Sequence, residues 1–103
     1  MIETFIVLTS VYWEDKYVYS GSKFNPNLFT AASRSLILGS CIVVDYNGSQ
    51  AKVLINDRGP CFSKKCQAER PDLLKRKLDI SLGTAKAIKF PGLGYLKYWK
   101  VKC

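Results

Sequence analysis

Carboxylates are the side chains best suited to acid–base chemistry in this 103-residue sequence, because the sequence contains no histidine. The absence of imidazole excludes Ser-His-Asp and Cys-His nucleophiles and histidine-ligated zinc. Two of the eight Asp and Glu residues stand out. Asp57 lies within the segment Asn56–Pro60 (Asn-Asp-Arg-Gly-Pro), and Asp79 precedes Ile-Ser. A carboxylic acid that protonates a leaving oxygen needs a raised pKa, which partial burial supplies.

Both carboxylates also have structural interpretations. Asp57 can hold its loop by accepting backbone N–H bonds or by pairing with Arg58 or Arg34, which favours the charged form and is the reverse of what an acid needs. Asp79 can be the N-cap of a following helix, a role worth about 1 kcal/mol. The sequence leaves both interpretations open for each residue.

The elements that would position these residues are mostly strands. A β-branched and aromatic run predicts a strand over Glu3–Tyr12. Two further β-rich runs, Cys41–Tyr46 and Ser49–Ile55, flank Asn47-Gly48, which predicts a hairpin with a type I′ turn. An ordered loop is expected over 13–29. The predicted architecture is a small, mainly β barrel with one or two short helices.

The second half of the chain carries the helical signals. A lysine- and arginine-rich segment spans 63–77, in which Pro71-Asp72 predicts a short helical turn. Asp79 or Ser81 is expected to cap a helix over about 82–89, which Pro91-Gly92 ends. A last strand is predicted over 95–101. Length and 48% hydrophobic content favour one domain over 1–103, and no uncharged run approaches the roughly 20 residues of a membrane span.

The chain is strongly basic, with 16 Lys and Arg against 8 Asp and Glu and a net charge of +8. Many of the cations gather in one stretch and the helix after it: Lys64, Lys65, Arg70, Lys75, Arg76, Lys77, Lys86 and Lys89. Such a cluster is either a solvated face or an attractor for a polyanion. Nucleic acid is not expected as a partner, because no aromatic residues interleave the cations and no nucleic-acid motif is present.

Four cysteines, at Cys41, Cys61, Cys66 and Cys103, make an even set in a small domain, which favours disulfides and an exported protein. A zinc site is the rival interpretation, but its ligands normally come as two close pairs, and only Cys61 and Cys66 are close; free thiols are the third. We expect no metal and no cofactor. Of three possible pairings we predict Cys61–Cys66 with Cys41–Cys103.

Three stretches together resemble a known family. They are Gly21–Asn27 leading into Thr30–Gly39, then Asn56–Pro60 after the hairpin, then Leu78–Ser81 before a helix. In this order and spacing they resemble the rare lipoprotein A (RlpA-like) family, whose fold is a six-stranded double-psi β-barrel shared with barwin, expansins and lytic transglycosylase A. The resemblance covers about residues 9–101.

The resemblance implies a lytic transglycosylase of bacterial peptidoglycan. The family's active residues fall at Ser22, Ser33 and Asp57, so only the Asp is retained, as the candidate acid/base. Serine can hydrogen-bond a sugar but cannot act as an acid or base near pH 7, which favours impaired catalysis or binding alone. Expansins place an important Asp in a motif like that of Asp79, here a possible second carboxylate. A non-catalytic carbohydrate-binding module or a secreted inhibitor or effector is the alternative.

Further substrate contacts are predicted within the motifs and in the segment that precedes them. Besides Ser22 and Ser33, they are Arg34, Arg58, Tyr12 and Tyr17, the tyrosines as stacking surfaces for sugar rings. The expected partner is peptidoglycan or another cell-wall glycan, bound by a monomer. The expected location is periplasmic or secreted, after removal of a leader.

Overall fold

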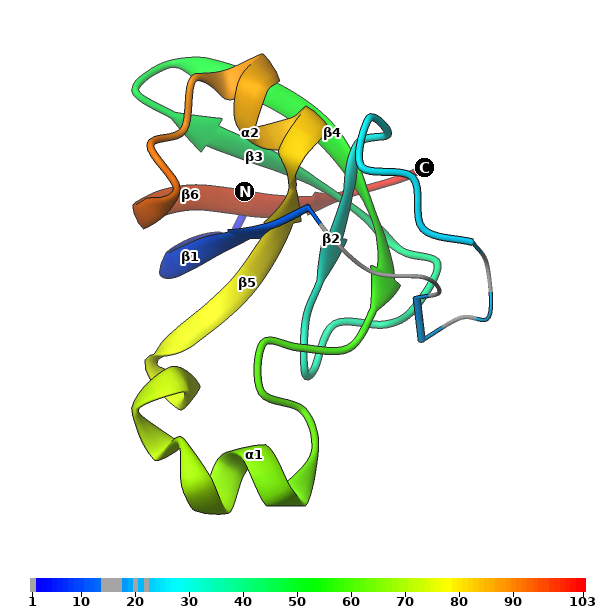
Figure 1. The fold of residues 1–103 in the computed structure, drawn as a ribbon. Helices are drawn as coiled ribbons and strands as arrows, with labels where there is room; N and C mark the ends of the chain where they lie inside the picture. Colours follow the sequence, from blue (N-terminus) through cyan, green and yellow to red (C-terminus); the bar gives the residue numbers. More distant parts are fainter. Residues whose placement is uncertain (1, 14–17, 20, 22) are drawn as a thin grey trace.

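The chain folds into a closed β-barrel with short helices at its ends (Figure 1). The computed structural model describes residues 2–13, 18–19, 21 and 23–103. Within these ranges the strands are β1 (Thr4–Tyr12), β2 (Thr30–Ala32), β3 (Cys41–Tyr46), β4 (Ser49–Asp57), β5 (Arg76–Ser81) and β6 (Leu93–Val101). The helical elements are α1 (Lys64–Glu69), the 3-10 turn η1 (Pro71–Lys75) and α2 (Leu82–Ile88). The expected six-stranded barrel is confirmed.

Alternation along the strands fills the barrel. In β4 the side chains of Ala51, Val53 and Ile55 are buried, whereas the residues between them face outward. Ile42 and Val44 of β3 point into the same core, which also includes Leu78 and Ile80 of β5 and Leu96 and Tyr98 of β6. The short helix α2 covers one end of this core with Ala85 and Ile88. A continuous core of this kind fixes the register of every strand around it.

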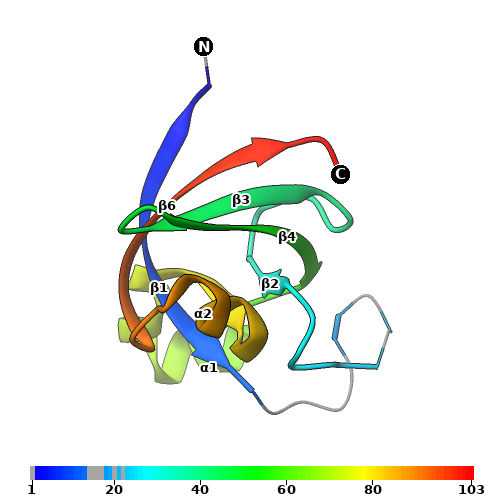
Figure 2. The ribbon, with the colours of Figure 1, turned by 90° about the horizontal axis from the view of Figure 1, so that it is seen from above.

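The strand order around the barrel is β1-β5-β2-β4-β3-β6, so neighbours other than those of the β3–β4 hairpin are distant in sequence. β5 runs parallel to β1, and β2 runs parallel to β4, whereas the other pairs are antiparallel. Figure 2 shows the short β2 beside the end of β4. Since β2 pairs with both β4 and β5, it brings the end of β4 and the end of β5 to the same part of the barrel wall.

Several sequence predictions are confirmed. The first strand, the β3–β4 hairpin and the last strand are present, and Asn47 and Gly48 both have positive φ, 52° and 89°. Helix α2 is capped by Ser81, whose Oγ accepts from the N–H of Thr84 at 3.2 Å. Asp79 is therefore not the cap, since it lies inside β5.

Both predicted disulfides are formed. Cys41 joins Cys103 with a Cα–Cα distance of 5.2 Å, and Cys61 joins Cys66 with a distance of 5.3 Å. The first attaches the residues after β6 to the start of β3, and the second joins the loop after β4 to α1. No helix within the described residues is long and apolar enough to cross a membrane.

Gly83 allows α2 to approach the loop before β2. A Cβ at this position would lie 2.6 Å from the carbonyl oxygen of Asn27, and the Gly83 N–H donates to Pro26 O at 2.7 Å. Gly→Ala inside a helix normally stabilises by about 1 kcal/mol. Here we expect Gly83→Ala to lower the free energy of unfolding by about 1–3 kcal/mol, because backbone must move to admit the methyl group.

Urea unfolding measures this effect, and Gly94→Ala is the control. A Cβ at Gly94 would meet only the Phe90 ring, at 3.8 Å, which is ordinary van der Waals contact. Stabilisation by Gly83→Ala would show that α2 does not pack closely on residues 26–27.

Candidate functional site

The two carboxylates singled out in the sequence lie on either side of β2. Ala32 is in register with Asp57 of β4 on one side and with Asp79 of β5 on the other. Neighbouring strands are about 4.8 Å apart, so the two backbones are about 10 Å apart at this level. On the far side of Asp79, Ser10 of β1 is its register partner. The topology thus gathers Ser10, Asp79 and Asp57 from three strands.

The pKa of Asp79 is raised, as a carboxylic acid that donates a proton near neutral pH requires. The hydroxyl of Ser10 donates to Asp79 Oδ1 at 3.1 Å. Burial raises the pKa of Asp79 to about 6, although the Ser10 hydrogen bond and the positive charge of Arg76 act in the opposite direction. The negative charge of Asp57 raises the pKa of Asp79 further. The two carboxylates are therefore close enough to influence each other.

Asp57 is held by the backbone. The N–H groups of Tyr19 and Arg58 both donate to Asp57 Oδ1, at 2.7 and 2.8 Å. The Asp57 carbonyl accepts from the N–H of Ser33 at 3.1 Å. The backbone contacts of the structural interpretation are thus present. The same interpretation allowed an ion pair between Asp57 and Arg58 or Arg34. Among the described residues no such pair is formed, and the one ion pair is Arg70–Asp72.

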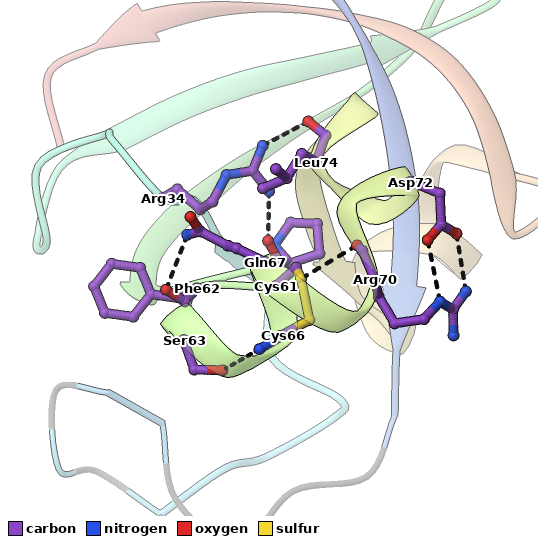
Figure 3. The surroundings of a disulfide bond; sticks show 10 residues. Arg34, Cys61, Phe62, Ser63, Cys66, Gln67, Arg70, Asp72 and Leu74 are labelled. Atoms are coloured by element: carbon purple, nitrogen blue, oxygen red, sulfur yellow. Dashed lines mark hydrogen bonds and ion pairs between the residues drawn. A yellow bond between two sulfur atoms is a disulfide. The ribbon is translucent and has the colours of Figure 1, made fainter.

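The two arginines instead bind carbonyl groups of the loops around the site. Arg34 donates to Pro60 O and, at 2.9 Å, to Leu74 O (Figure 3). Arg58 donates to Ser33 O at 3.0 Å and to Leu36 O. Both side chains are half-buried. They fix the loops that border the carboxylates, and their predicted contact with substrate stays a prediction.

Ser33, predicted to contact substrate, is buried, and its hydroxyl is already hydrogen-bonded. Its Oγ accepts from the N–H groups of Ser35 at 3.2 Å and Leu36 at 3.0 Å, which caps the turn after β2. Tyr12 is half-buried: its ring lies 5.0 Å from that of Phe24, and its hydroxyl bonds Thr30 Oγ1 at 3.2 Å. The predicted contacts Ser22 and Tyr17 lie outside the described residues.

Sequence reasoning missed Ser10 and Phe62. Ser10 reaches Asp79 only through the parallel register of β1 with β5, which no local pattern indicates. Phe62, 43% exposed, meets Tyr19 beside Asp57 because the loop after β4 turns back to the site. Within the described ranges, no group of three or more Asp, Glu, Cys or His side chains gathers to hold a metal ion.

Comparison with known proteins agrees with the fold and with the motifs. The lytic transglycolase family matches residues 4–98, nearly the whole chain. The chain belongs to this family. Among solved structures, the Streptomyces papain inhibitor has the same fold, with a TM-score of 0.70 over 97% of this chain and 96% of that one, at 16% identity. At this identity the likeness shows the fold alone.

Two relatives in the family share clear sequence similarity with the chain. Both are named "Probable endolytic peptidoglycan transglycosylase RlpA": one from Nostoc sp. is 38% identical over 77 residues, and one from Synechocystis sp. is 38% identical over 71 residues. The matches cover 73% and 67% of this chain but only 18% and 19% of the relatives. The chain carries Asn-Asp-Arg-Gly-Pro at residues 56–60, and the roles expected for Ser22, Ser33 and Asp57 stay predictions.

Proposed function

We propose that this domain binds glycan strands of peptidoglycan and cleaves them as a lytic transglycosylase. The observation that carries the proposal is the pair formed by Asp57 and Asp79, in which Asp79 has a pKa of about 6. Enzymes that break glycosidic bonds commonly use two carboxyl groups whose environments differ. Family membership and the relatives' printed activity support the choice of substrate.

The reaction needs one acid and no water. Protonated Asp79 donates its proton to the glycosidic oxygen, and the bond from that oxygen to the anomeric carbon breaks. The 6-hydroxyl of the same sugar attacks the anomeric carbon and passes its proton to the Asp79 carboxylate, which restores the acid. Ionised Asp57 stabilises the positive charge that develops on the sugar ring. The products are a shortened strand and an anhydro-ended strand.

This assignment changes the roles expected from sequence. Asp57 is the acid/base expected from sequence, but two backbone N–H groups already occupy its Oδ1. Burial raises the pKa of Asp79, and Ser10 orients its carboxyl group. Asp57 therefore acts as the anionic partner and Asp79 as the proton donor and acceptor.

Binding without cleavage is the second candidate, and Ser33 favours it. The buried Ser33 hydroxyl caps a turn and keeps its own proton at neutral pH, so it cannot exchange a proton with Asp57 or substrate. A domain that lacks this partner but keeps the glycan surface would be a wall-binding module. Two disulfides support an oxidising compartment, which accords with an exported protein that meets the wall.

Product analysis tests the proposal. Purified protein is incubated with glycan strands freed of stem peptides, and the products are read by mass spectrometry. Anhydro-ended fragments support cleavage. Intact strands that nevertheless co-sediment with the protein support the binding module, and absence of both contradicts the proposed function.

The pH dependence of cleavage should report Asp79. Because the acid must be protonated, kcat/KM is expected to fall about tenfold per pH unit above pH 6. Arg76 lowers the pKa of Asp79, so Arg76→Gln should move this alkaline limb to higher pH. Lys77→Gln, which removes a neighbouring exposed charge, is the matched control. An alkaline limb that Arg76→Gln leaves in place would mean that another group is the acid.

A further inference from the structure

Two exposed aromatic rings meet beside Asp57. Tyr19 is 61% exposed and Phe62 is 43% exposed, and their ring centroids lie 5.5 Å apart in an edge-to-face arrangement. The N–H of Tyr19 is bonded to Asp57 Oδ1 at 2.7 Å, which places this residue against the carboxylate. Exposed aromatic surface is costly to hydrate, and two such rings lie together here.

Phe62 is held in position by the loop in which it stands. The Cys61–Cys66 disulfide closes that loop, and Gln67 Nε2 donates to Phe62 O at 3.1 Å (Figure 3). Ser63 Oγ accepts from the N–H of Cys66 at 3.1 Å and so caps α1. The backbone on both sides of Phe62 is therefore fixed, although its ring faces solvent.

The loop is also attached to the barrel wall. Arg34, two residues after β2, donates to Pro60 O before the loop and to Leu74 O beyond α1. One side chain thus bonds both ends of the segment that carries the disulfide. The ring of Phe62 is therefore presented by a segment that the disulfide and Arg34 both hold in place.

We propose that Tyr19 and Phe62 form a stacking platform for a sugar ring of the bound glycan strand, positioned by the disulfide-closed loop. This inference rests on the proposed function and assigns these residues a role in binding. The flat C–H faces of pyranose rings pack on aromatic rings, whereas the ring hydroxyls remain free to bond polar groups. A sugar seated on the platform leaves its neighbour in the strand close to Asp57.

Binding measured without turnover tests the platform. In an Asp79→Asn background, the dissociation constant is measured by calorimetry for strands freed of stem peptides and for a hexamer of β-1,4-linked N-acetylglucosamine. Phe62→Ala and Tyr19→Ala should each weaken binding about tenfold, the loss of one aromatic contact. Tyr19→Ala keeps the backbone N–H that bonds Asp57. Phe62→Trp should retain affinity, and Phe62→Leu, which keeps apolar bulk, should not.

Tyr95 provides the matched control. It is 65% exposed on β6 and lies beside the Asn47–Gly48 turn, at the opposite end of β4 from Asp57. Tyr95→Ala should leave affinity unchanged, and Cys61→Ser with Cys66→Ser should weaken it as Phe62→Ala does. Full affinity in Phe62→Ala and Phe62→Leu would overturn the platform while the proposed function stood. A parent protein that neither binds nor cleaves strands would overturn both.

Discussion

Asp79→Asn is expected to lower the rate of glycan cleavage at least 100-fold while it stabilises the protein near neutral pH. The rate falls because an amide cannot donate a proton to the leaving oxygen, and general acid catalysis contributes about 10²–10⁴-fold. Product formation from stem-peptide-free strands measures the effect. Asp72→Asn, in which an exposed carboxylate paired with Arg70 becomes an amide, should cleave at the wild-type rate.

The stabilisation by Asp79→Asn follows from the raised pKa of the native carboxyl group. The pKa of Asp79 is raised from 3.8 to about 6 in the folded protein. Its protonated form therefore contributes stability that is present below about pH 4 and lost as pH rises through about 6. The loss reaches up to about 3 kcal/mol, at about 1.4 kcal/mol for each pKa unit.

Asp79→Asn removes this loss, because the amide is neutral at every pH. The variant should be more stable than wild type in urea at pH 8 and equally stable at pH 3.5. Strong destabilisation at both pH values would show that Asp79 is structural. A stable variant that still cleaves would exclude it as the acid and leave Asp57, for which Asp57→Asn is the decisive change, since the amide oxygen can still accept both backbone bonds.

Removal of the Cys41–Cys103 disulfide is expected to have the largest effect on stability. The bond closes a sequence separation of 62 residues, and a loop of that length contributes about 4 kcal/mol in the chain-entropy model. Cys41→Ala with Cys103→Ala should therefore lower Tm by about 15–30 °C. Differential scanning calorimetry measures the change.

The second disulfide supplies the comparison. Cys61 and Cys66 are only five residues apart, so their replacement should cost about 2 kcal/mol by the same model. If loss of Cys61–Cys66 destabilised the barrel more than loss of Cys41–Cys103, the entropic account would be contradicted. The segment around Cys61–Cys66 would then have to support the barrel core directly.

Sequence was sufficient for features with a strong local signal. Asn47-Gly48 between two β-rich runs defined the hairpin, and the order of three motifs indicated the barrel that the structure confirms. The cysteine pairing was also predicted correctly. The turn and the disulfides are predictable because few residue types favour positive φ, and because four cysteines have only three possible pairings.

Features that depend on distant partners were missed. β2 is only three residues long, and Thr-Ala-Ala has no strand signal of its own. β5 lies at the end of a basic run, so the strand period of Leu78 and Ile80 was obscured by charge. The raised pKa of Asp79 arises from burial between strands, which neither residue type nor spacing reveals.

The strand order has a consequence for how the chain reaches this state. β1 pairs with β5 and β6. Leu8 of β1, for example, lies opposite Arg76 of β5 and Tyr95 of β6. A chain emerging from its amino end has nothing with which β1 can pair until nearly all residues are available. Loop closure over such distances slows folding compared with helical proteins of the same size. The barrel should therefore form late and all at once, and partial chains that lack β6 should remain unfolded and sensitive to proteases.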